Sequence, residues 1–78
     1  MPQPIERNAK VTANTERGIG LGHVHTVVEA TNAIFVQLKV GTKLLNRYFA
    51  AADENRTWIR GHDIEKLQAA MAAEAMKG

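Results

Sequence analysis

Three histidines and one neighbouring carboxylate are the residues of this sequence best suited to bind a metal ion. His23 and His25 are separated by a single residue, and His62 is followed directly by Asp63. On a strand, His23 and His25 would point to the same side, whereas on a helix they diverge by about 200°. Because this segment is interpreted below as helical, we predict no metal site and no cofactor, and we expect the histidines to be surface imidazoles.

Three alternating glycines, Gly18, Gly20 and Gly22, are a second candidate, because glycine amides at the start of a helix can surround a phosphate. Their spacing differs from the dinucleotide-binding pattern, and no Lys-Ser or Lys-Thr pair follows them. A flexible joint is therefore the simpler interpretation of this segment.

Catalysis lacks its usual side chains in this sequence. There is no Cys and no Ser, and the carboxylates occur singly apart from Asp53-Glu54 and the pair Asp63 and Glu65. Pockets of about 300 Å³ or more, the size typical of ligand sites, are also unusual in so short a chain. We therefore predict that the protein is not an enzyme and that it acts by contact.

Positive charge shows one regular pattern. Lys39, Lys43 and Arg47 are spaced four residues apart, which on a helix forms one basic ridge. Arg56 and Arg60 could extend this ridge, and such a surface fits a phosphate backbone or an acidic protein surface. Ten Lys and Arg stand against eight Asp and Glu, so the net charge of +2 favours nucleic-acid binding only weakly.

The elements that would position these side chains are predicted from hydrophobic spacing. Apolar residues recur at intervals of three and four over residues 24–52, which indicates one long amphipathic helix. Residues 36–40 alternate between apolar and polar side chains, so a half-buried strand followed by a turn at Gly41 is the rival interpretation. The helix is preferred because the spacing continues through Gly41, and whether residues 33–40 are helix or strand stays open.

The two ends of the chain are predicted to differ from this middle region. Pro2 and Pro4 disfavour an early helix, so residues 1–22 are interpreted as an extended arm and Gly-rich joint. Residues 55–61 interrupt the apolar pattern. A short amphipathic helix is expected from His62 onward, with acidic residues in its first turn, as the helix dipole favours.

The predicted fold class is all-α. Residues 23–78 would form a helical hairpin of one long amphipathic helix and one short C-terminal helix, preceded by the extended N-terminal arm. The long helix would extend about 45 Å, and the short helix would cover about half of it, so the uncovered apolar surface predicts a homodimer or a higher oligomer. The residues expected at a partner or oligomer interface are Val24, Val28, Phe35, Leu38, Gly41, Tyr48 and Trp58.

Three functions are compatible with this interpretation. The first is a small accessory protein of the inhibitor or regulator type, which binds itself and a protein partner through the apolar helical face. The second is a structural subunit of a larger particle such as a phage virion, with the N-terminal arm ordered on a neighbour. The third is a nucleic-acid-binding protein that uses the basic ridge. The sequence shows no signal-peptide pattern and no apolar run of about 20 residues, so we expect a cytoplasmic or virion location and no membrane partner.

Overall fold

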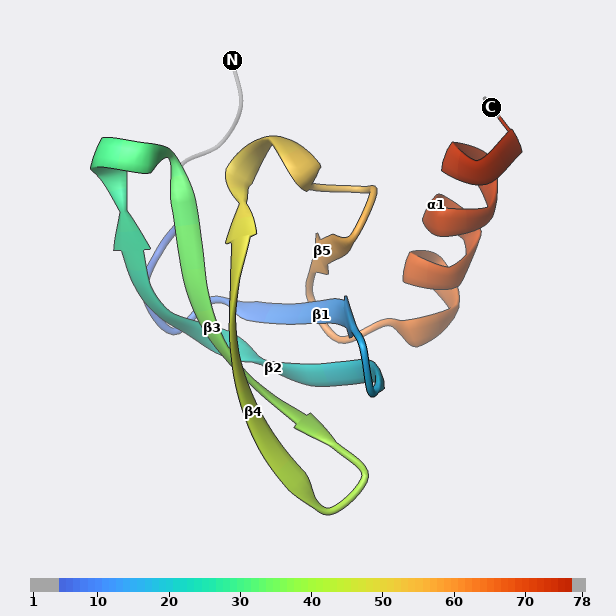
Figure 1. Cartoon of the computed structure of the whole chain (residues 1–78), viewed down its shortest axis with the longest axis horizontal. Coiled ribbons are helices and arrows are strands. Elements are labelled where there is room, and N and C mark those ends of the chain that lie inside the picture. Colours follow the sequence, from blue (N-terminus) through green and yellow to red (C-terminus); the bar gives the residue numbers. More distant parts are fainter. Residues whose placement is uncertain (1–4, 77–78) are drawn as a thin grey trace.

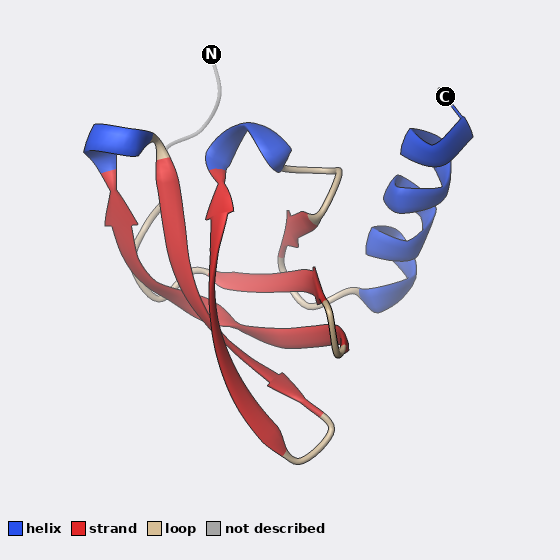
Figure 2. Cartoon of the chain, viewed as in Figure 1, coloured by secondary structure: helices blue, strands red, loops and turns tan. Residues whose placement is uncertain are grey.

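The computed structural model describes residues 5–76, which form an antiparallel sheet followed by one helix (Figure 1). Figure 2 shows the strands in red and the long C-terminal helix in blue. The strands are β1 (Lys10–Thr15), β2 (Gly18–Val28), β3 (Ala33–Val40), β4 (Lys43–Ala50) and β5 (Trp58–Arg60), and the helix is α1 (Ile64–Met76). Short 3-10 turns, η1 (Glu29–Thr31) and η2 (Ala51–Asp53), follow β2 and β4.

The strand order in the sheet is β4-β3-β2-β1-β5, and all neighbouring strands are antiparallel. Strands β1 to β4 follow one another as a meander. Strand β5 then returns to pair with β1, which makes β4 and β5 the two outer strands of the sheet.

The all-α prediction is wrong, because residues 24–52 form three strands in place of one long helix. The alternation over residues 36–40 was the correct signal: Val36 and Leu38 are fully buried on one side of β3. Turns interrupt this alternation at Asn32 and Gly41, both with positive φ, so apolar residues of separate strands happen to fall three or four positions apart. Residues 33–40 are therefore a strand, and Gly41 belongs to a turn.

The glycines expected to form a flexible joint lie inside β2, where the sheet curls tightly. A Cβ atom on Gly20 would lie 2.8 Å from the side chain of Val40, and one on Gly22 would overlap the carbonyl oxygen of Gln37. Only glycine fits where β2 and β3 come this close. The predicted extended arm is also wrong over residues 10–22, which are β1, a turn and the start of β2. Residues 1–4 of the predicted arm lie outside the described residues.

The hydrophobic core fills the concave side of the curled sheet. Its members come from all of the central strands and from β5: Val11, Ala13, Val24, Ile34, Val36, Leu38 and Trp58. The indole Nε1 of Trp58 donates a 2.9 Å hydrogen bond to the carbonyl of Ala50, which links β5 to the end of β4. The largest side chain of the core is therefore also hydrogen-bonded, as a buried indole requires.

Helix α1 covers the other side of β1 and β5 and leaves β2, β3 and β4 open on that side (Figure 1). Leu67 of α1 is fully buried, as are Thr12 and Ile59 on neighbouring positions of β1 and β5. The hydroxyl of Thr12 donates to the carbonyl of Gly61 (2.7 Å) and accepts from the amide of Asp63 (3.0 Å). The predicted C-terminal helix is confirmed. Among residues 5–76, no helix has the length and apolar character needed to cross a membrane.

Candidate functional site

The side of β2, β3 and β4 that faces away from the core is solvent-exposed, and we call it the open face. Successive side chains of a strand point to opposite sides, so the residues next to the buried Val24, Ile34, Val36 and Leu38 lie on the open face. Two apolar side chains on it are exposed to an unusual degree, Leu44 (65%) and Tyr48 (68%). Its polar and aromatic members, with the exposed Leu44, are His23, His25, Thr26, Phe35, Gln37, Lys39, Leu44, Asn46 and Tyr48, and the smaller or half-buried Leu21, Val28, Ala33 and Ala50 complete it.

Three rings form a row across the open face. The rings of Phe35 and Tyr48 lie 4.6 Å apart between centroids with an interplanar angle of 43°, and those of His25 and Phe35 lie 5.9 Å apart at 73°. Phe35 and Tyr48 are directly paired in the β3–β4 ladder. The two-residue turn at Gly41 and Thr42 makes theirs a non-hydrogen-bonded pair, in which facing side chains come closest. We call this the aromatic row.

A bulge in β2 adds the third ring to the aromatic row. Val24 pairs with Val36 and Thr26 pairs with Phe35, so His25 is an extra residue with no partner of its own. Val24 and Val27 both contribute to the core side. His25 and Thr26 are therefore two consecutive residues on the open face, which a regular strand would not allow.

The charge on these strands is of one sign. Strands β2, β3 and β4 contain no Asp and no Glu, whereas they hold Lys39, Lys43 and Arg47 together with two histidines. The carboxylates of the described chain lie in the turns, near the N-terminus and on α1. On the open face, the exposed side chain of Lys39 is two positions from Gln37, which pairs with Asn46. The open face is thus aromatic, amide-bearing and cationic.

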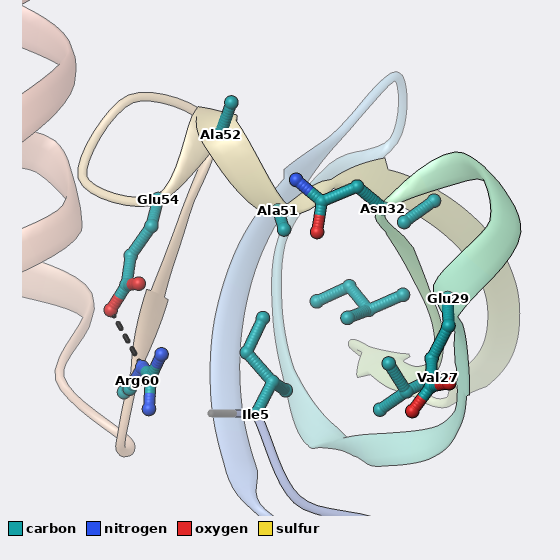
Figure 3. Close-up of a pocket in the computed structure, with 10 residues that line it drawn as sticks. Ile5, Val27, Glu29, Asn32, Ala51, Ala52, Glu54 and Arg60 are labelled. Atoms are coloured by element: carbon teal, nitrogen blue, oxygen red, sulfur yellow. Dashed lines mark hydrogen bonds and ion pairs between the residues drawn. The ribbon is translucent and has the colours of Figure 1, made fainter. Parts of the chain in front are cut away.

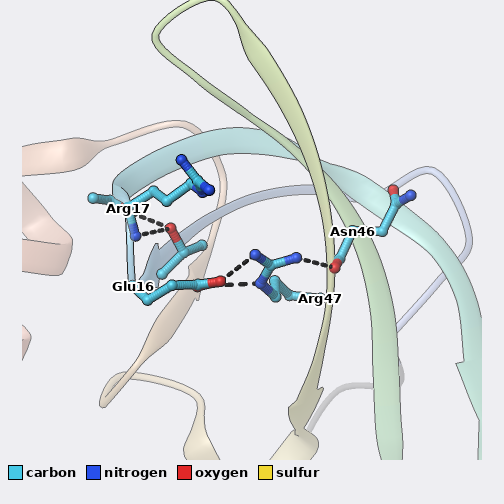
Figure 4. A network of polar contacts seen from close by, with 6 residues as sticks. Glu16, Arg17, Asn46 and Arg47 are labelled. Atoms are coloured by element: carbon cyan, nitrogen blue, oxygen red, sulfur yellow. Dashed lines mark hydrogen bonds and ion pairs between the residues drawn. The ribbon is translucent and has the colours of Figure 1, made fainter.

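The predicted basic ridge is not formed, because strand alternation separates its members. Lys39 is on the open face, but Arg47 is on the core side of β4 and pairs with Glu16 of the β1–β2 turn (Figure 4). Arg47 Nε lies 3.2 Å from Glu16 Oε2, and Arg47 Nη1 donates a 2.7 Å bond to the carbonyl of Asn46. Hydrogen bonding between the two groups lowers the pKa of Glu16 and raises that of Arg47.

The other predicted basic residues are also dispersed. Arg56 lies 3.7 Å from Glu74 of α1, and Arg60 lies 2.8 Å from Glu54. Lys43 is exposed at the start of β4, beside the turn. Of the five predicted basic contacts, only Lys39 shares the open face with the aromatic row.

The predicted interface residues divide into two groups. Val24, Leu38 and Trp58 are fully buried in the core, Val28 is half-buried at the end of β2, and nothing lies close to Gly41. Phe35 and Tyr48, in contrast, reach the open face, although the helical interpretation assigned them to an apolar stripe. Sequence reasoning missed Leu44, Gln37 and Asn46, which the alternation of β3 and β4 would have placed beside them.

The histidines are not assembled with carboxylates. His23 and His25 precede and follow Val24 in β2, and both are on the open face. His62 Nε2 lies 2.8 Å from the carbonyl oxygen of Gly22. Within residues 5–76, no group of three or more His, Asp or Glu is placed to hold a metal ion.

One pocket of about 510 Å³ lies at the end of the curled sheet near η1 and η2 (Figure 3). It is larger than expected for so short a chain. Its wall is apolar at Ile5, Val27 and Ile34, and its polar residues include Glu29 and the Glu54–Arg60 ion pair. This lining could hold a small apolar group, but it pairs no nucleophile with a base among the described residues.

The aromatic row is therefore the most distinctive arrangement of side chains on the described surface. It combines ring faces, amide groups and positive charge within three neighbouring strands. Comparisons with protein-family models, with curated proteins and with solved structures gave no match, so the function is inferred from this geometry alone.

Proposed function

We propose that the chain is a non-enzymatic module that binds single-stranded nucleic acid across the open face. The observation that carries this proposal is the aromatic row on strands without a single carboxylate, in which His25 and Tyr48 are exposed and Phe35 is half-buried between them. The basic ridge of the helical interpretation is not part of it, because that ridge does not exist.

The rings supply a surface on which bases can stack. Tyr48 is 68% exposed, so its ring is accessible to a ligand without rearrangement of the core. Stacking of one base on an aromatic side chain contributes about 1–3 kcal/mol and tolerates any base, because every base has a planar face. Phe35 and Tyr48 at 4.6 Å form a continuous apolar surface for such contacts.

The polar groups of the open face are suited to the rest of a nucleotide. Two ladder positions along from the Phe35–Tyr48 pair, and so on the same face, Gln37 and Asn46 are directly paired. Amide side chains both donate and accept hydrogen bonds, as base edges do. Lys39 follows at the next position on this face and can approach a phosphate without competition from a carboxylate on these strands.

A single strand fits this face better than a duplex. In a double helix the base planes are stacked on one another, whereas unpaired bases can be spread over an aromatic surface. A protein partner would contact the same apolar side chains, but its recognition would depend on apolar bulk and not on a ring. The predicted protein-binding and particle-subunit functions therefore remain predictions, and the experiment below separates the first of them from the proposal.

Fluorescence anisotropy with labelled oligothymidylate and oligouridylate tests the proposal directly. Tyr48→Leu keeps an apolar side chain but removes the ring, so it should weaken binding about 5- to 150-fold, the equivalent of one lost stacked base. Tyr48→Trp should retain or strengthen binding. Ile64→Ala, at a partly exposed position of α1, is the control and should bind like the wild type.

Two outcomes would count against nucleic-acid binding. One is the absence of any anisotropy change at low salt with either oligonucleotide. The other is wild-type affinity of Tyr48→Leu, which would show that apolar bulk suffices and would favour a protein ligand. A cytoplasmic location, predicted from the sequence, would give the module access to such strands and is part of this proposal.

A further inference from the structure

Strand β4 is an outer strand of the sheet, and part of its edge has no partner within the described chain. Because Gly41 and Thr42 form a two-residue turn, the backbone amides and carbonyls of the odd-numbered residues of β4 hydrogen-bond to β3. Those of the even-numbered residues point away from β3, toward the free edge. Two contacts agree with this assignment. The carbonyl of Ala50 accepts from Trp58 Nε1, and that of Asn46 accepts from the guanidinium of Arg47.

The unpaired stretch has defined limits. On one side it is bounded by the turn at Gly41 and Thr42, and on the other by Ala50, whose carbonyl is occupied by Trp58. The outward backbone groups between these limits are those of Leu44, Asn46 and Tyr48. Asn46 is the centre of the stretch, and its carbonyl accepts a bond from the partly exposed Arg47 side chain. Unpaired backbone amides and carbonyls along the edge of a sheet can pair with another strand.

We propose that residues 44–48 pair with the same residues of a second copy of this chain, antiparallel, with Asn46 at the two-fold axis. In this register Leu44 lies opposite Tyr48 of the partner subunit on the open face. These are the two most exposed apolar side chains of the sheet, and each would cover the other. The pairing requires that Arg47 give up its hydrogen bond to the Asn46 carbonyl, while Glu16 continues to hold the guanidinium.

Charge selects this register over its neighbours. If one β4 strand moved by one residue along the other, the open face of one copy would lie beside the core side of the other copy. Only a shift of two residues keeps both open faces on the same side of the joined sheet. One such shift places Arg47 opposite Arg47 of the partner subunit, and the other places it opposite Lys43 of the partner subunit. Like charges directly opposite are unfavourable. With Asn46 at the axis, Arg47 faces Leu45 of the partner subunit and Lys43 faces Phe49 of the partner subunit.

The resulting dimer would have one continuous sheet with both aromatic rows on the same side. The inference does not depend on nucleic-acid binding, because its evidence is the free edge and its readout is the mass of the particle. A protein that binds no oligonucleotide could still form this dimer, and a monomer could still bind an oligonucleotide.

Charge complementation at the axis is the decisive experiment. Asn46→Lys or Asn46→Glu alone places two like charges opposite each other, so each variant should sediment as a monomer, whereas the wild type should sediment at twice the 8.6 kDa chain mass. An equimolar mixture of the two variants should recover the dimer, because opposite charges then meet. The same charge changes at Gln68, an exposed residue of α1, should leave the dimer intact. A monomeric wild type, dimeric single variants or a mixture that stays monomeric would overturn the proposal.

A crosslinking measurement tests the register even if the charged variants fold poorly. The chain contains no cysteine, so Asn46→Cys introduces a unique thiol. In the proposed register this thiol faces its own copy and should be joined by a short bifunctional thiol reagent. Leu44→Cys faces Tyr48 of the partner subunit and should not react in this way. Crosslinking at position 44 in preference to position 46 would contradict the proposed pairing.

Discussion

Trp58 Nε1 and the carbonyl of Ala50 lie 2.9 Å apart, and their hydrogen bond connects the two outer strands of the sheet. No ladder joins β4 to β5, so this side-chain contact substitutes for backbone pairing between them. The indole is fully buried, whereas Ala50 is exposed, so the bond lies at the boundary between the core and the surface. It fixes the end of β4, and with it the position of Tyr48 two residues earlier.

Replacement of Trp58 by phenylalanine tests this contact. Trp58→Phe keeps an aromatic ring but leaves the Ala50 carbonyl without its donor and the core underfilled. We expect a loss of about 1–3 kcal/mol in the free energy of unfolding, measured by urea denaturation. Tyr48→Phe removes an exposed hydroxyl and should change stability by less than about 0.5 kcal/mol. Equal stability of Trp58→Phe and the wild type would show that the hydrogen bond contributes little.

Two glycine substitutions should differ sharply. In Gly22→Ala the new methyl group would overlap the backbone of β3 at Gln37, so we expect the chain not to reach the native fold, as judged by circular dichroism. Gly41→Ala meets open space but has a φ of +62°, so only the strain of the left-handed conformation, about 1–2 kcal/mol, is expected. A stable Gly22→Ala protein would mean that β2 and β3 can separate without loss of the fold.

The hydroxyl of Thr12 should stabilise the junction between the sheet and α1. Thr12→Val preserves the shape of the side chain but leaves the Gly61 carbonyl and the Asp63 amide without their partner. We expect a loss of about 1–3 kcal/mol in thermal or urea unfolding, because the site is buried. Thr42→Val, in the exposed β3–β4 turn, is the matched control and should have little effect. Similar losses in both variants would argue against a specific role for the hydroxyl.

The ion pair of Glu16 and Arg47 predicts a dependence of stability on pH. Arg47 lowers the pKa of Glu16 below its usual value of 4.5 in the folded state. A group with a depressed folded pKa contributes fully above the unfolded pKa, and this contribution is lost as the pH falls through the folded value. When the pH falls from above 4.5 to below the lowered pKa of folded Glu16, the Glu16→Gln protein should therefore lose less stability than the wild type.

Arg47→Gln provides the complementary measurement, because it removes the other member of the same pair. Its midpoint of thermal unfolding should show the same reduced sensitivity to acid as Glu16→Gln. Both groups are partly exposed, with side-chain exposures of 34% for Arg47 and 59% for Glu16, so the effect should shrink as salt is added. Unchanged acid sensitivity in both variants would show that other carboxylates control it.

Salt dependence tests the role of Lys39 in the proposed nucleic-acid site. If Lys39 contacts one phosphate, Lys39→Gln should weaken oligonucleotide binding at low salt. It should also reduce the slope of log affinity against log salt by about 0.7, the value for one contact to a single strand. Lys66→Gln, on α1, removes the same charge elsewhere and should leave the slope unchanged. Equal slopes for the Lys39 variant and the wild type would place the phosphates elsewhere.

The C-terminal helix could be predicted from the sequence because its signals are local. Asp63 accepts a 3.0 Å hydrogen bond from the amide of Lys66 at the start of α1, and Leu67 is fully buried, as one face of an amphipathic helix requires. The interruption between the middle region and this helix was also predicted, and Asn55 and Gly61 in it both have positive φ. Caps, breakers and helical spacing act within a few residues, so one sequence suffices to find them.

The sheet could not be derived in the same way, because its stability comes from contacts distant in sequence. Strand β5 is three residues long and is defined by its pairing with β1, some 45 residues earlier in the chain. The bulge at His25 also shifts the two-residue alternation within β2. The aromatic row was missed for the same reason: a strand directs Phe35 to the side opposite Ile34, whereas the helical interpretation placed both on one apolar face.

The pairings on the two sides of His25 would both survive its removal. Val24 would remain opposite Val36 and Thr26 opposite Phe35, with the ladder then continuous and the interior unchanged. The inserted residue makes two contacts of its own: its carbonyl accepts a 3.3 Å hydrogen bond from Arg7 Nε, and its ring meets the ring of Phe35 edge-on. Neither contact lies in the hydrophobic core, so the bulge alters the surface of the sheet and leaves its interior as an unbulged strand would.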